Sequence, residues 1–159
     1  MRLPDGACFT YGSLMWAPIM GRASGAPEGS LRARPAWLTG HARHGVHGQD
    51  YPGVVVSPEA RADSSQAAGP VVQGVLYEGL TPAQLACLDR FEGEEYERVA
   101  VAVWCHPPDE AARLRAEPVP AWLYRFRAEF RHRLTSGPWD PQAFEREGMA
   151  RFLKQYPGF

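Results

Sequence analysis

A predicted helix over residues 82–91 carries an acidic side chain at the end of its apolar face. Positions spaced i, i+3, i+4 and i+7 share one side of a helix, and here they are Leu85, Leu88, Asp89 and Glu92. If the leucines face the core, the helix brings the Glu92 carboxylate into an apolar environment. Burial of this kind raises the pKa of a carboxyl group, and a raised pKa is typical of general acid/base residues. The pattern therefore makes Glu92 a candidate general acid/base.

The same residues allow a second interpretation, in which Glu92 lies in an exposed turn. The helix would then end early, and Glu92 would share a solvated turn with Glu94 and Glu95. It could instead form a surface ion pair with Arg90 or Arg98, a contact that contributes little to stability. The pattern alone leaves both interpretations open.

Residues 9–15, FTYGSLM, join an aromatic, β-prone run to a glycine and a hydroxyl residue. A strand is predicted over residues 7–14, and Gly12 falls near its end. Glycine suits sharp bends and places where another molecule approaches the main chain, because it has no side chain. The main-chain N–H groups around Gly12 could therefore approach a ligand oxygen. The alternative is an ordinary turn at the end of a strand.

Three histidines, His41, His44 and His47, lie close together in the sequence without predicting a metal site. On a strand the first and third share a face while the second points away, and no acidic ligand stands near in sequence. We expect structural or solvent-facing roles for them, and no metal bound by them.

The bulk composition limits the partners and the compartment that we expect. Lys and Arg number 17 against 18 Asp and Glu, a net charge of −1, so no overall field favours nucleic acid or a membrane surface. No apolar run approaches the roughly 20 residues of a membrane helix, and the N-terminus lacks a signal-peptide pattern. The three cysteines, an odd number without C-x-x-C spacing, indicate reduced thiols, and a cytoplasmic location is predicted; they are Cys8, Cys87 and Cys105.

A cluster of arginines near the C-terminal third could contact RNA or another acidic partner. Arginine is nearly the only base in this chain, however, so a solvated basic face is the better interpretation. The cluster comprises Arg125, Arg127, Arg131 and Arg133.

The elements that must position these residues are mostly strands, with a central and a terminal helix. Thr81, Pro82 and Gln84 predict the start of the central helix, as cap, first helical residue and partner of the cap. The sequence Asp140-Pro141 predicts the start of a last helix that contains Met149, Phe152, Leu153 and Tyr156. Strands are predicted at 7–14, 36–47, 53–56, 71–77, 96–104 and 119–126, a helical turn at 16–22, and loops at 21–30 and 59–69.

This order predicts an α+β fold, a curved or barrel-like mixed sheet with a few helices. With 159 residues and 45% hydrophobic content, the chain has the size of one domain, which we take to span residues 1–159.

Several motifs together resemble the gamma-glutamylcyclotransferase-like family, most closely its gamma-glutamylamine cyclotransferase branch, which includes the plant avirulence-induced proteins. The resemblance runs from about residue 8 to about residue 150 and is strongest in the combination of YGSL with FEG-x-x-Y-x-R. The motifs that carry it are YGSL at 11–14, YPG at 51–53, VQGVLY at 72–77 and LDRFEG followed by YER at 88–98, with Trp139 and Phe144.

The resemblance implies a small β-barrel with helices and a cavity, and an enzyme that releases 5-oxoproline from a γ-glutamyl compound. The partner is then a small-molecule γ-glutamyl substrate, and no cofactor or metal is needed. By resemblance Glu92 is the catalytic acid/base, and the loop of Tyr11, Gly12, Ser13 and Leu14 holds the glutamyl group and the developing oxyanion. The resemblance also suggests Tyr96, Arg98 and Tyr124 as substrate-binding or orienting residues.

Two functions remain open at this stage. One is a cyclotransferase or related acyl-transfer enzyme. The other is a non-catalytic small-molecule-binding or regulatory module that keeps the fold and its cavity. The presence of Glu92 favours the enzyme, because a pocket that only binds has no need of a desolvated base. The oligomeric state and the leaving amine or amino acid are not predicted.

Overall fold

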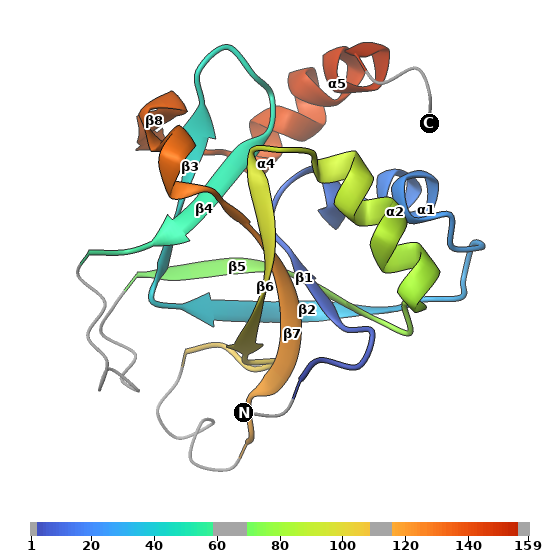
Figure 1. Cartoon of the computed structure of the whole chain (residues 1–159). Coiled ribbons are helices and arrows are strands. Elements are labelled where there is room, and N and C mark those ends of the chain that lie inside the picture. The colour runs from blue at the N-terminus through green and yellow to red at the C-terminus, as the bar shows by residue number, and fades with distance from the viewer. Residues whose placement is uncertain (1–2, 59–69, 109–115, 156–159) are drawn as a thin grey trace.

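A five-stranded mixed sheet forms the centre of the fold, in the strand order β2-β5-β1-β7-β6 (Figure 1). Strands β1 and β7 pair in parallel, and the other neighbours pair antiparallel. The structure is a computed structural model that describes residues 3–58, 70–108 and 116–155. The strands of this sheet are β1 (Cys8–Thr10), β2 (Arg32–Thr39), β5 (Val71–Glu78), β6 (Tyr96–Val103) and β7 (Val119–Phe126).

A second, three-stranded antiparallel sheet lies beside the first and has the order β4-β3-β8. Its strands are β3 (His41–Val46), β4 (Pro52–Val56) and β8 (Leu134–Pro138). Strand β3 follows β2 after one residue, Gly40, whose φ of 73° lies in the left-handed region. This glycine therefore allows the chain to turn from one sheet into the other.

Helices cover one side of the central sheet. Helices α1 and α2 lie side by side there, and the C-terminal helical segments pass over the end of the molecule that carries β3 and β4 (Figure 1). The helical segments are η1 (Ser13–Met15), α1 (Ala17–Ser24), α2 (Pro82–Glu92), η2 (Ala128–Arg133), α4 (Pro141–Ala143), the π-helical η3 (Phe144–Gly148) and α5 (Met149–Gln155).

The expected barrel is not closed. The outer strands of the five-stranded sheet, β2 and β6, approach each other at one bridge, where Trp37 and Trp104 exchange two backbone hydrogen bonds of 2.7 and 2.9 Å. No ladder of further pairs joins the two strands within the described residues. The α+β class is as predicted, whereas the barrel is a strongly curled sheet with a second small sheet beside it.

Strand β1 is buried on both faces, because it separates two hydrophobic clusters. Phe9 packs inside the curled sheet with Leu76 and Leu123, whereas Cys8 faces the cluster under the helices, with Leu88 among its members. The alternation follows from the two-residue repeat of a strand. Strand β1 thus leads the chain directly from the core into the FTYGSLM segment.

Most predicted elements are present, and the differences have local causes. The predicted strand over 7–14 was wrong beyond Thr10, because the chain turns at Gly12 and continues as the 3₁₀ turn η1. The segment 36–47 forms two strands instead of one. Neither β8 nor η2 was predicted, and Tyr156 and the loop 59–69 lie outside the described residues.

The central helix begins and ends as the sequence indicates. The Thr81 hydroxyl accepts the Gln84 N–H at 3.1 Å, while the Gln84 side chain accepts the Thr81 N–H at 2.9 Å, which completes the capping box. At the other end Gly93 has a φ of 78° and donates to the Asp89 carbonyl. Both caps are made by residues close in sequence, and together they fix the position of Glu92 at the end of the helix.

We predict that Gly74→Ala destabilises the protein, because a methyl group at residue 74 of β5 would clash with the Thr10 carbonyl oxygen and with the Phe9 ring. Overpacking of this kind costs about 1–3 kcal/mol of unfolding free energy. Urea denaturation measures the loss. The matched control is Gly137→Ala in β8, where nothing lies within 4 Å of the added methyl. Equal effects of the two substitutions would contradict a close contact between β5 and the end of β1.

Candidate active site

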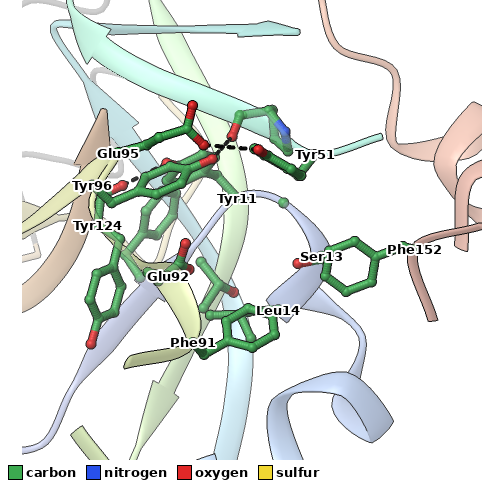
Figure 2. A pocket seen from close by; sticks show the side chains of 14 residues that line it. Tyr11, Ser13, Leu14, Tyr51, Phe91, Glu92, Glu95, Tyr96, Tyr124 and Phe152 are labelled. Atoms are coloured by element: carbon green, nitrogen blue, oxygen red, sulfur yellow. Dashed lines mark hydrogen bonds between the residues drawn. The ribbon is translucent and has the colours of Figure 1, made fainter. Parts of the chain in front are cut away.

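A cavity opens where the loop after β1, the end of α2 and strands β6 and β7 meet. Figure 2 shows Glu92 between the Tyr11–Leu14 loop and the tyrosines of β6 and β7, with Phe152 on the far side. The lining residues are Phe9, Thr10, Tyr11, Gly12, Ser13, Leu14, Tyr51, Pro52, Phe91, Glu92, Glu95, Tyr96, Tyr124 and Phe152. All the residues predicted for the site line this cavity, with the exception of Arg98.

Glu92 is the last residue of α2 and projects into the cavity below the buried Leu85 and Leu88. The residue as a whole is half-buried because it borders the opening, yet its carboxyl group is surrounded by protein. Burial raises the pKa of this carboxyl from 4.5 to about 8. Within the described residues no hydrogen bond or ion pair engages the Glu92 side chain. The surface-turn interpretation of Glu92 is therefore wrong for this structure.

The loop after β1 fits against β4 because residue 12 is glycine. A Cβ at Gly12 would lie 2.8 and 2.9 Å from two ring atoms of Pro52, so a side chain there would push the strand away. The φ of Gly12 is −133°, outside the left-handed region that favours glycine. The close approach of Pro52 therefore explains the glycine better than backbone strain does. The contact holds the loop at the wall of the cavity.

The main chain of this loop has its carbonyl groups occupied and its N–H groups free. The Gly12 carbonyl accepts from Met15 N at 3.0 Å, and the Ser13 carbonyl accepts from Trp16 N at 3.3 Å. No hydrogen bond of the described residues uses the N–H of Gly12, Ser13 or Leu14. The three residues that carry these donors line the cavity that contains Glu92. The donors are therefore available to an oxygen of a bound molecule.

The three predicted tyrosines are buried, and each hydroxyl donates to another part of the protein. Tyr11 donates to the Tyr124 carbonyl at 2.6 Å, and Tyr96 donates to the Pro52 carbonyl at 2.7 Å. Tyr124 donates to Asp89 at 2.7 Å. Because each hydroxyl has one proton to donate, these contacts indicate that the rings shape the wall and hold its elements together.

Arg98 lies outside the cavity, at a neighbouring hollow that shares Glu92, Tyr96 and Tyr124 with it. Its guanidinium pairs with Asp89 at 2.9 Å and stacks over the Trp122 ring at 4.5 Å. Asp89 precedes Glu92 by one helical turn, so Arg98 and Tyr124 together fasten the end of α2 to the two strands. The location of Arg98 favours an orienting role over substrate contact.

A second carboxylate, Glu95, lines the cavity and was not predicted there. Its oxygens accept from the Tyr51 hydroxyl at 2.9 Å and from Arg133 at 2.9 Å, and its side chain is 17% exposed. In the sequence Glu95 belongs to a short acidic run next to a glycine. This pattern predicts only a solvated turn. Its place depends on contacts with residues 44 and 38 positions away.

The other residues that attracted attention in the sequence do not add a site. Within the described residues, no group of three or more His, Cys, Asp or Glu side chains could hold a metal ion. The three cysteines are free thiols, and Cys8 is buried. In the arginine cluster, Arg125 and Arg127 lie 3.4 and 3.8 Å from Glu97, so part of its charge is compensated. None of the described helices is long and apolar enough to cross a membrane.

Comparison with known proteins finds a matching family model. The family described as gamma-glutamyl cyclotransferase, AIG2-like, matches residues 8–141. No protein of curated function matches the sequence.

Solved structures support the fold. Two solution structures of Arabidopsis thaliana proteins are similar, each 23% identical. The first has a TM-score of 0.61, and the alignment covers 94% of this chain and 87% of the Arabidopsis chain. The second has a TM-score of 0.63, and the alignment covers 99% of this chain and 85% of the Arabidopsis chain. A structure described as gamma-glutamyl cyclotransferase is 16% identical, with a TM-score of 0.57 and coverage of 94% and 84%.

We predict a pH-dependent stability that depends on Glu92. Its pKa is raised in the folded state, so between about pH 4.5 and pH 8 the unfolded chain releases a proton that the folded protein retains. The neutral carboxyl therefore stabilises the fold fully at low pH, and this contribution is lost as the pH rises through about 8. Wild type should lose up to a few kcal/mol relative to Glu92→Gln over this range.

Urea denaturation at pH 5, 6.5 and 8 measures this difference. The control is Glu129→Gln, a substitution of an exposed glutamate on η2, which should leave the pH dependence of wild type in place. A wild-type curve parallel to that of Glu92→Gln would show that the carboxyl is not buried in solution.

Proposed function

Because the chain belongs to the gamma-glutamyl cyclotransferase, AIG2-like family, we propose that it releases 5-oxoproline from a γ-glutamyl amine or a γ-glutamyl amino acid. In this reaction the α-amine of the glutamyl group attacks its own γ-carbonyl carbon. A five-membered lactam forms, the original amide C–N bond breaks, and an amine or amino acid leaves. The observation that carries the proposal is the unpaired Glu92 carboxyl in one cavity with three free main-chain N–H groups.

Glu92 is the group that moves the protons. As a carboxylate it accepts a proton from the α-ammonium, which frees the nitrogen lone pair for attack. After the C–N bond is made, the same carboxyl gives a proton to the nitrogen that leaves. Acid/base action of this kind typically contributes about 10²- to 10⁴-fold in rate.

Because the pKa of Glu92 is raised, proton transfer from the α-ammonium to its carboxylate is nearly balanced in free energy. An α-amino group has a pKa of about 8, and an ordinary glutamate of about 4.3, a mismatch worth roughly 5 kcal/mol. With burial raising the pKa of Glu92 to about 8, most of this mismatch is removed. The absence of an ion-pair partner for Glu92 among the described residues supports the role, because a cation beside it would lower the pKa again.

Electrostatic stabilisation of the transition state comes from the loop of Tyr11, Gly12, Ser13 and Leu14. Attack places a negative charge on the γ-carbonyl oxygen, and preorganised N–H donors stabilise such a charge. The N–H of Gly12 has no acceptor among the described residues and is therefore available to this oxygen. Intramolecular attack also needs the glutamyl chain folded back on itself, and the enclosing aromatic walls of the cavity restrict it to such conformations.

A non-catalytic binding module on the same fold is the weaker alternative. Ligand binding alone gains nothing from a carboxyl group whose burial is uncompensated, because that burial costs stability at neutral pH.

The direct test is 5-oxoproline release from a panel of γ-glutamyl amines and γ-glutamyl dipeptides. We expect release by wild type, and a loss of about 10²-fold or more in kcat for Glu92→Gln because the proton acceptor is gone. Glu129→Gln serves as the control with unchanged activity. Folded wild type without release from any substrate, or a fully active Glu92→Gln variant, would refute the proposal.

The pH profile gives a second prediction. Because Glu92 must be deprotonated and the substrate's α-ammonium must still carry the proton that is passed on, kcat/KM should rise toward about pH 8 and fall again above it. The residual activity of Glu92→Gln should lack this acidic limb. If kcat/KM instead fell only near pH 4, the ordinary range for a glutamate, the base would be a carboxyl group with an unperturbed pKa.

A further inference from the structure

The guanidinium of Arg43 lies behind the loop that carries the free N–H groups. Arg43 comes from β3, within the HARHGVH segment, and is half-buried. One of its terminal nitrogens, Nη1, donates to the Tyr11 carbonyl at 2.9 Å and to the Gln73 carbonyl at 3.2 Å. The group also lies over the ring of Trp139, 5.4 Å from its centroid. Arg43 does not line the cavity of Glu92.

The contact with Tyr11 fixes one peptide plane. In a trans peptide the carbonyl of one residue and the N–H of the next point in opposite directions. The Tyr11 carbonyl accepts from Arg43, which does not line the cavity, so the N–H of Gly12, a lining residue, is directed away from Arg43.

We propose that Arg43 is a positioning residue, which holds the Tyr11–Gly12 peptide so that the Gly12 N–H faces the developing oxyanion. This inference rests on the proposed cyclotransferase function. The following two carbonyls, of Gly12 and Ser13, are held by the turn itself through Met15 and Trp16. The Tyr11 carbonyl is outside that turn, and Arg43 supplies the donor that the turn does not.

The charge of Arg43 strengthens the effect of the bond. A cation that donates to a carbonyl polarises the peptide, which makes the N–H at the other side a better donor. The loss of hydration on burial lowers the pKa of Arg43, but an arginine remains protonated at neutral pH. Its positive charge therefore acts on the oxyanion through the peptide without entering the cavity.

Arginine suits this position better than lysine does. Its planar head can bridge Tyr11 and Gln73 while its face rests on the Trp139 ring, and a lysine ammonium has no such face. The bridge ties the catalytic loop to β5, and the ring contact ties it to the segment before α4.

The test compares Arg43→Met and Arg43→Lys with wild type in 5-oxoproline release. We expect Arg43→Met to lower kcat by about 10- to 100-fold with a much smaller change in KM, because the oxyanion exists only after attack. Arg43→Lys should restore part of kcat, since its ammonium can donate to the Tyr11 carbonyl. Arg34→Met is the matched control, a half-buried, ion-paired arginine on β2 that does not line the cavity.

The Gly12 amide signal in a ¹H–¹⁵N spectrum provides a readout that needs no turnover. Its ¹⁵N shift should move in Arg43→Met, move less in Arg43→Lys and stay in place in Arg34→Met, because the shift depends on hydrogen bonding at the preceding carbonyl. An unmoved Gly12 signal, or a rise in KM at constant kcat, would overturn the role of Arg43. Absence of 5-oxoproline release by wild type would instead refute the proposed function, while the Gly12 shift still decides whether Arg43 holds the peptide.

Discussion

The carboxyl group of Glu92 has to be surrounded by protein and left without a partner, and much of the molecule serves this condition. An unpaired buried carboxyl costs stability, so it persists only where the surrounding elements are rigid enough to keep water and cations away. The buried Leu85 and Leu88 fix the helix against the core, and Asp89 one turn earlier takes the ion pair with Arg98. This nearby cation is thereby occupied by Asp89, and Glu92 is left without an ion-pair partner among the described residues.

Neutral donors complete the frame around this carboxyl. Three buried tyrosines bind the carbonyls of Tyr124 and Pro52 and the carboxylate of Asp89, and so connect the loop after β1, strand β4 and helix α2 to β6 and β7. A lysine or arginine in the same places would satisfy the same acceptors, but it would stabilise the charged form of Glu92 and lower its pKa. Tyrosine gives the connection without the charge.

The parts of the site that residue spacing alone predicted are those with local causes, whereas the tyrosines followed from the family resemblance. The cap by Thr81 and Gln84, the apolar stripe and the end at Gly93 all lie within thirteen consecutive residues, and each was readable from spacing. Glu95 and Arg43 depend on partners at least 30 residues distant, through pairings that only the sheet topology creates. Strand β8 was missed for another reason. Its sequence LTSGP contains weak strand formers, and it survives as an outer strand of its sheet, where such residues are tolerated.

The single bridge between Trp37 and Trp104 also affects how the molecule meets its neighbours. The outer strands of an open sheet offer unpaired backbone groups that other chains can join, which leads to aggregation. Here Trp104, the residue directly after β6, pairs with Trp37 of β2, so the two edges of the sheet cover each other's backbone groups at that point. A sheet that curls this far therefore gains much of the protection of a closed barrel, while its other end stays open to form the wall of the cavity.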